Sequence, residues 1–218
     1  MILYGYFRSS AAYRVRIALN LKGIAVEHVP VHLLKDGGQQ RLPAHLQRNP
    51  QGIVPALELD DGTILTQSLA IIEYLDVLRP TPRLIPADPV LAARVRAVAL
   101  AVACEIHPLN NLRVLNYLKG PMNHTQDDVD AWYRHWTLEG GLDAIEQLLP
   151  GNAFCFGNAP TLADCCLIPQ LFNARRFKIG YAHLPKIMGA ETSCKALAAF
   201  AAAHPSQQPD AQERISSN

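Results

Sequence analysis

The sequence predicts two domains of different class, a small α/β domain followed by a larger all-α domain. Strand and helix patterns alternate over residues 1–80, as they do in an α/β layer. A proline-rich stretch follows, and from residue 89 to about residue 203 the apolar residues keep a helical period with almost no strand alternation. We therefore place the two domains at residues 1–80 and 88–212.

The α/β domain begins with a predicted strand, helix and strand. Residues 2–6 are rich in β-formers, and a helix follows from Ser9 and Ser10 to a stop at Gly23. A second strand spans residues 26–31 and ends at a polar loop. Three basic residues fall away from the apolar face of the helix: Arg14, Arg16 and Lys22.

A hairpin and a further helix complete this domain and predict a mixed sheet. Residues 53–59 and 63–66 flank an Asp-Asp-Gly turn, and Ser68 is placed to cap the next helix. Val54-Pro55 leaves two interpretations open. A cis bond would turn the backbone of Val54 outward to pair with an extended peptide, whereas an edge strand would tolerate the proline without any ligand.

The second domain is predicted as a series of helical segments. They span residues 89–119, 126–149, 161–177 and 185–203. Asp88 is the expected N-cap of the first segment, and Thr161-Leu162-Ala163-Asp164 forms a capping box whose role we take as structural. The polar end of the chain from Pro205 to Asn218 is expected to fray.

The composition is that of a globular protein with almost no net charge. Hydrophobic residues make up 49% and charged residues 18% of the chain, and the net charge is +1. These values exclude a disordered chain and argue against nucleic-acid binding through bulk charge. No apolar run reaches the ~18 residues of a membrane span, no secretory signal is visible, and the five cysteines form no Cys-x-x-Cys pair. We expect a cytoplasmic protein with no membrane, nucleic-acid or metal partner.

Two predicted helix starts carry groups suited to an anionic ligand. Ser9-Ser10 and Gln67-Ser68 each follow a strand directly. Free N–H groups and hydroxyl donors at a helix N-terminus stabilise an anion and lower the pKa of a thiol placed there. Taken alone, Ser-Ser is a weak signal that is more typical of an ordinary helix cap without a ligand, and Ser68 can also be only a cap.

A series of further motifs runs in order through nearly the whole chain. The segments are Tyr4-x-Tyr6-Phe7-Arg8-Ser9-Ser10, Arg14-Val15-Arg16-Ile17-Ala18-Leu19, residues 35–40, Asn49-Pro50, Val54-Pro55, residues 67–75, 79–84, 161–164 and 174–177, His204-Pro205 and Gln208-Pro209-Asp210. As a set, they resemble the zeta-class glutathione transferases, the family of maleylacetoacetate isomerase.

The resemblance implies a thioredoxin-like N-terminal domain that binds glutathione and an all-helical C-terminal domain that supplies most of the second-substrate pocket. Ser9 and Ser10 would hold the glutathione sulfur, with Ser10 as the activating hydroxyl. The other residues that the resemblance assigns to glutathione binding are Gln40, Val54 through its backbone, Gln67, Ser68, His107, Asn111 and Arg113. Without the resemblance, His107 would be read as a packed core residue.

Arg8, Arg113 and Arg176 would each alone be a surface charge. If the fold brought them to one cleft, they would clamp an acidic substrate, because guanidinium groups bind carboxylates bidentately. With Ser9 and Ser10, Arg8 and Arg176 are the expected catalytic residues.

The implied activity is glutathione-dependent cis–trans isomerisation of maleylacetoacetate to fumarylacetoacetate, in aromatic amino acid catabolism, by reversible thiolate addition to the double bond. Two alternatives are isomerisation of maleylpyruvate in gentisate degradation and conjugation or dehalogenation of small α-halo acids. A homodimer is also implied. Animal and fungal members of the family usually read Ser-Ser-Cys at the first helix start, and bacterial relatives vary there. This chain has Ala11, so no protein cysteine acts at that position.

Overall fold

Residues 1–212 are described by the computed structural model of the chain, and they form two units. The first unit combines Met1–Leu84 with the C-terminal segment that begins at Lys195, and the second unit is Ile85–Cys194. By its contacts, the segment after residue 194 therefore joins the first unit, whereas the sequence placed it in the helical domain.

The first unit is built on a four-stranded mixed sheet with the strand order β2-β1-β3-β4. The strands are β1 (Ile2–Gly5), β2 (Glu27–Pro30), β3 (Ala56–Glu58) and β4 (Ile64–Thr66). β1 pairs with β2 in parallel and with β3 antiparallel, and β3 pairs with β4 antiparallel. The predicted α/β class and the mixed sheet are confirmed.

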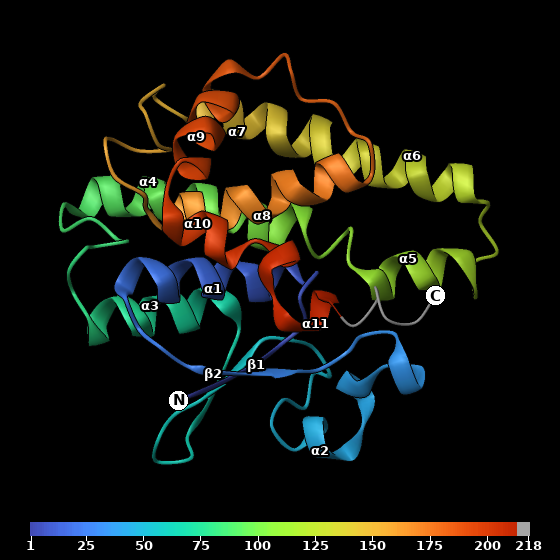
Figure 1. Cartoon of the computed structure of the whole chain (residues 1–218). Coiled ribbons are helices and arrows are strands. Elements are labelled where there is room, and N and C mark those ends of the chain that lie inside the picture. The colour runs from blue at the N-terminus through green and yellow to red at the C-terminus, as the bar shows by residue number, and fades with distance from the viewer. Residues whose placement is uncertain (213–218) are drawn as a thin grey trace. The chain divides into compact units, whose positions relative to one another are not determined.

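Two helices pack on one face of this sheet, α1 (Ser10–Lys22) and α3 (Ser68–Leu78), while the short α2 (Pro43–Leu46) lies on its other side (Figure 1). α1 ends as predicted at Gly23, which adopts the left-handed conformation with φ 60°. Two 3-10 turns, Lys35–Gly37 and Gln39–Arg41, occupy the expected polar loop. α10 (Ala198–Ala203) packs against α1 from the C-terminal end of the chain.

The end of the chain is ordered as far as it is described. A 3-10 turn, Pro205–Gln207, and the short helix α11 (Pro209–Gln212) follow α10. Gln208 donates a hydrogen bond to the carbonyl of Ala202 at 2.9 Å, and Asp210 is only 9% exposed. The expectation of a frayed end is therefore wrong for residues 205–212, and residues 213–218 lie outside the described residues.

The second unit is helical. Its elements are α4 (Pro89–Leu100), the π-helical turn Ala101–Ile106, α5 (Leu112–Lys119), α6 (Gln126–Thr137), the π-helical turn Leu138–Leu142, α7 (Asp143–Leu148), α8 (Leu162–Arg176) and α9 (Pro185–Lys195), whose last residue opens the C-terminal segment. Asp88 caps α4 by accepting from Leu91 N at 2.7 Å, as predicted. The expected helix 89–119 is broken at residues 107–111. No helix within residues 1–212 has the length and hydropathy needed to cross a bilayer.

The predicted capping box forms at the start of α8. Asp164 is fully buried and accepts hydrogen bonds from the backbone and the hydroxyl of Thr161 at 2.8 and 2.9 Å. Its other oxygen accepts from the backbone N–H of Cys155 at 2.9 Å. Asp164 thus ties a preceding loop to the helix start, which agrees with the structural role predicted for it.

Candidate functional site

The turn between β1 and α1 presents Ser9 and Ser10. Ser9 is the N-cap of α1, since its Oγ accepts from Ala12 N at 3.2 Å while its own N–H donates to the carbonyl of Tyr6 at 2.9 Å. Because Ser9 Oγ acts as an acceptor in the cap, its hydroxyl hydrogen is available to a ligand. Ser10 is the first helical residue and is only 4% exposed. The first turn, residues 10–13, carries no carboxylate. An anion bound here is therefore stabilised by the helix dipole without repulsion from an acidic side chain in that turn.

The start of α3 differs from the prediction that Ser68 caps it. Gln67 occupies the N-cap position, with φ 66° and ψ 118°, and its amide donates to Oε1 of Gln51 at 2.6 Å. Ser68 is the first helical residue, and its hydroxyl accepts from Nη1 of Arg14 at 3.2 Å. A non-glycine residue at positive φ is uncommon and is concentrated at functional sites.

Arg14 is a residue that sequence reasoning did not assign to the site. It lies in α1 and is only 2% exposed, yet its guanidinium reaches Ser68 at the start of α3. Since Arg14 is four residues after Ser10, both side chains lie on the same side of α1. The buried cation therefore connects α1 to the start of α3, through a contact across 54 positions that no local pattern in the sequence signals.

Gln40 and Val54 lie in loops of the same unit. Gln40 is 8% exposed, and its buried Oε1 has no hydrogen-bond partner among residues 1–212. A buried polar atom of this kind is rare and calls for an explanation such as a ligand. The Val54-Pro55 bond is cis and precedes β3, an interior strand, so the alternative of a proline in an edge strand does not hold.

His45 and Asn49 fix the backbone just before Val54. His45 Nε2 and Asn49 Nδ2 both contact the carbonyl of Ile53, at 2.9 and 2.8 Å. The two side chains are 3% and 1% exposed, so this carbonyl is held from inside the unit. Asn49 was noted in the sequence as part of the motif Asn49-Pro50 but not as a site residue, and His45 was not noted.

Arg8 is held by the aromatic side chain of Tyr6. Its Nη2 and Nε donate to the Tyr6 hydroxyl at 2.7 and 3.2 Å, and its guanidinium lies 5.1 Å from the ring centre of Phe7. These contacts fix the direction of a cation that directly precedes Ser9. Two helix starts, an unpaired amide oxygen and this cation together fit a ligand such as glutathione, which carries a thiol, amides and carboxylates.

The predicted site residues of the second unit have varied surroundings. Asn111 caps α5 by accepting from Arg113 N at 3.1 Å, which already gives it a structural role. His107 is partly buried at the end of the π-helical turn, and Arg113 is exposed. Arg176 is exposed near the end of α8, with its guanidinium 5.3 Å from the ring centre of Phe177.

Arg176 lies beside an aromatic stack. The ring of Phe177 stacks on that of Tyr133 at 3.8 Å, and burial raises the pKa of Tyr133 above its usual value while Arg176 opposes that rise. Arg8 belongs to the first unit and Arg113 and Arg176 to the second. Their convergence on one substrate therefore stays a prediction.

None of the five cysteines forms a disulfide, and four of them are buried. Cys155, Cys165, Cys166 and Cys194 are buried, and Cys104 is exposed. Burial, with a smaller contribution from the Asp164 carboxylate, raises the pKa of the Cys155 and Cys194 thiols well above the usual value. Across residues 1–212, no group of three or more His, Cys, Asp or Glu side chains is placed to hold a metal ion.

Comparison with known proteins identifies relatives over nearly the full length. The sequence model of the glutathione S-transferase N-terminal domain matches residues 3–83, and that of the glutathione S-transferase C-terminal domain matches residues 129–203. The maleylacetoacetate isomerase of Pseudomonas aeruginosa is 49% identical over 96% of this chain and 98% of its own length.

Solved structures agree with the sequence matches. A maleyl pyruvate isomerase in its holo form, described as a bacterial zeta-class glutathione S-transferase, superposes with a TM-score of 0.91 at 44% identity, covering 96% of this chain and 99% of that one. The maleylacetoacetate isomerase of Methylobacterium extorquens, solved with bound malonate and GSH, gives a TM-score of 0.91 at 42% identity, with coverage of 97% and 99%.

Proposed function

Since this chain belongs to the zeta class of the glutathione S-transferase family, we propose that it is a glutathione-dependent cis–trans isomerase that converts maleylacetoacetate to fumarylacetoacetate in aromatic amino acid catabolism. The observation that carries the proposal is that Ser9 and Ser10 lie at the N-terminus of α1 and that the first turn of this helix contains no acidic side chain. That arrangement suits a thiolate.

The first unit holds glutathione in this proposal. Ser10, together with Ser9 and the N–H groups of α1, stabilises the sulfur in its anionic form. The rest of the tripeptide is bound by the unpaired amide oxygen of Gln40, by the backbone of Val54, and by Gln67 and Ser68 at the start of α3. When bound, glutathione supplies the thiolate that adds reversibly to the cis double bond.

Residues of the second unit complete the assignment. His107, Asn111 and Arg113 border the glutathione site, and Arg8 and Arg176 neutralise the carboxylate and the negative charge that develops on the acidic substrate. The positions of Arg8 on Tyr6 and of Arg176 beside Phe177 support these roles, because aromatic contacts hold each guanidinium in one direction.

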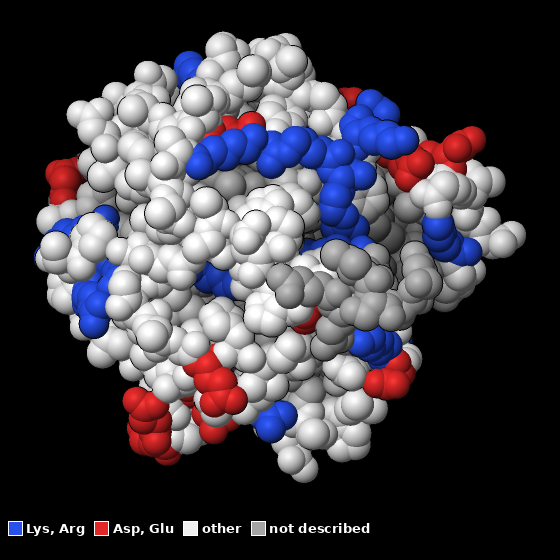
Figure 2. Space-filling view, viewed as in Figure 1, with Lys and Arg blue, Asp and Glu red and all other residues white. Residues whose placement is uncertain are grey.

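Selectivity for an acid must be local in this protein. The net charge is +1, and basic and acidic side chains both occur on the face shown in Figure 2. A protein of this charge does not attract acids over its whole surface. The proposed preference therefore depends on individual arginines, and each can be tested by a single substitution.

Isomerisation of maleylacetone, a small analogue of the substrate, tests the function. Turnover that requires glutathione is expected. Glutathione binding without turnover would refute the isomerase and indicate a binding module on the same fold. Values of kcat/KM for maleylacetoacetate and maleylpyruvate, measured side by side, distinguish the proposed substrate from the second candidate, which is favoured by a zeta-class relative of that activity.

The Ser10→Ala variant tests the assignment of the activating hydroxyl. A lost hydrogen bond to a charged sulfur is worth about 1.5–3 kcal/mol, which corresponds to a rise of roughly 1–2 units in the pKa of bound glutathione. Ultraviolet titration of the thiolate measures it. An unchanged titration would transfer the role to Ser9 or to the backbone.

We also propose that the protein is a cytoplasmic homodimer. Five free cysteines suit a reducing compartment. Light scattering at micromolar concentration tests the dimer, for which a mass of twice 24.0 kDa is expected.

A further inference from the structure

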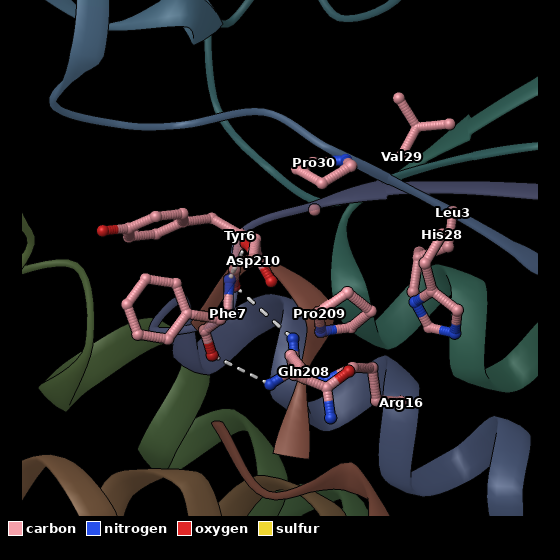
Figure 3. A pocket seen from close by; sticks show the side chains of 11 residues that line it. Leu3, Tyr6, Phe7, Arg16, His28, Val29, Pro30, Gln208, Pro209 and Asp210 are labelled. Carbon is pink, nitrogen blue, oxygen red and sulfur yellow. Dashed lines mark hydrogen bonds between the residues drawn. The ribbon is translucent and has the colours of Figure 1, made fainter. Parts of the chain in front are cut away.

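The motif Gln208-Pro209-Asp210 has no role in the proposed function, yet it lies beside the turn that carries the predicted thiolate site. Figure 3 shows the pocket that these residues share with the end of β1, with part of β2 and with Arg16 of α1. The pocket has an empty volume of about 320 Å³ including the solvent at its mouth. All of these residues belong to the first unit.

Asp210 binds the backbone of the turn at the N–H of Phe7. Its Oδ2 accepts from the N–H of Phe7 at 2.8 Å, across 203 positions of sequence. Phe7 is only 8% exposed, so its N–H would otherwise be buried without an acceptor.

Arg16 binds the backbone carbonyls of Tyr6 and Phe7 in the same turn. Its Nη2 donates to the carbonyl of Phe7 at 3.0 Å and its Nη1 to that of Tyr6 at 3.4 Å, while its Nε donates to the carbonyl of Ala203 at 3.1 Å. The side chain is 4% exposed. Burial lowers the pKa of Arg16 to about 10, and the Asp210 carboxylate opposes that shift.

The held peptide groups lead directly into the catalytic turn. The carbonyl of Tyr6 accepts from Ser9 N as well as from Arg16, and Arg8 and Ser9 follow Phe7 in the chain. A displacement of the Phe7 peptide would therefore move the cap of α1 and the cation before it.

We propose that Asp210 and Arg16 are positioning residues, and that the C-terminal motif fixes the Tyr6–Ser9 turn in the geometry that stabilises the glutathione thiolate. The proposal rests on the proposed function for its catalytic consequence, but the contact to Phe7 is independent of it. In this proposal Asp210 acts through the backbone of Phe7 and not through contact with glutathione or substrate.

The test compares Asp210→Ala and Asp210→Asn with wild type. In the ligand-free protein, the Phe7 and Ser9 amides of Asp210→Ala should exchange with deuterium at least about tenfold faster, since the hydrogen bond to a carboxylate is lost. With glutathione, kcat should fall about tenfold and the pKa of the bound thiol should rise, while KM for the acidic substrate changes less than about twofold. Asp210→Asn should restore much of the slow amide exchange and of kcat, because its amide oxygen can still accept from Phe7 N.

Asp130→Ala is the matched control, because Asp130 is an exposed carboxylate on α6 that accepts a hydrogen bond from the side chain of Gln126 in its own helix. Its exchange rates and kcat should equal those of wild type. Arg16→Lys is a second variant that retains the positive charge. Like Asp210→Ala, it should speed amide exchange, lower kcat and raise the pKa of the bound thiol. Faster exchange with unchanged kcat and thiol pKa would show a purely structural contact and overturn the proposal, as would unchanged exchange in folded Asp210→Ala. Failure of wild type to bind glutathione would instead refute the proposed function.

Discussion

Replacing Lys22 by Met should destabilise the first unit strongly, because this lysine is buried at the junction of α1 and α3. Its Nζ donates to Asp76 Oδ1 at 2.5 Å, to the carbonyl of Arg79 at 2.8 Å and to the carbonyl of Pro82. The side chains of Lys22 and Asp76 are 0% and 8% exposed. All three donors of the ammonium group are therefore used within the protein.

The magnitude follows from what remains after the substitution. Asp76 keeps the hydrogen bond from Leu84 N at 2.7 Å but loses its counter-charge in a buried position. Removing one partner of a buried ion pair destabilises proteins by about 3–5 kcal/mol. For a total stability of about 5–15 kcal/mol, this is a large share of the whole.

The assay is urea denaturation followed by far-UV circular dichroism, with fluorescence recorded in parallel. Both tryptophans, Trp132 and Trp136, lie in the second unit, so fluorescence reports that unit separately. Lys119→Met, at an exposed lysine of α5, is the control and should change the free energy of unfolding by less than about 0.5 kcal/mol. A loss below about 1 kcal/mol for Lys22→Met would refute the assignment of a buried ion pair.

Three further predictions concern other parts of the chain. Under native conditions a thiol reagent should label only Cys104, since the other four thiols are buried, and Cys104→Ser should abolish labelling; a second labelled site would contradict this. Burial, and secondarily the charge of Arg16, lowers the pKa of His28 in the folded protein. The unfolded state therefore binds more protons below pH ~6.5, and the free energy of unfolding should fall as the pH decreases from 7 to 5. In urea titrations, His28→Gln should flatten that decline. Glu146 accepts from the N–H groups of Lys186 and Ile187 at 3.0 Å each, so Glu146→Ala should lower the free energy of unfolding by about 2–3 kcal/mol and Glu146→Gln by less.

Local chemistry made much of the fold predictable. The stop at Gly23, the cap at Asp88 and the box around Asp164 each depend on residues within four positions of one another, and the structure confirms all three. The strand expected over residues 53–59 is shorter, because Pro55 has no N–H for the ladder and pairing starts at Ala56.

The candidate site was predictable where side chains act locally and not where they act across the fold. Ser9 forms the expected cap, whereas Ser68 does not, because Gln67 takes the cap position at positive φ. Arg14 and Asp210 reach Ser68 and Phe7 over 54 and 203 positions of sequence. No periodicity within one element encodes contacts of that separation.

The burial of the three basic residues that lie off the apolar face of α1 is not indicated by the sequence pattern. Arg14, Arg16 and Lys22 would be solvent-exposed on an amphipathic helix, but they are 2%, 4% and 2% exposed. Successive positions of a helix differ by about 100°, so Arg14 and Arg16 point to nearly opposite sides. One therefore reaches the start of α3 and the other reaches the β1–α1 turn and α10, while Lys22 closes the end of α3. Each cation is held by backbone carbonyls, a hydroxyl or one carboxylate. The three side chains therefore connect α1 to the neighbouring elements of this unit, which the net charge of +1 does not indicate.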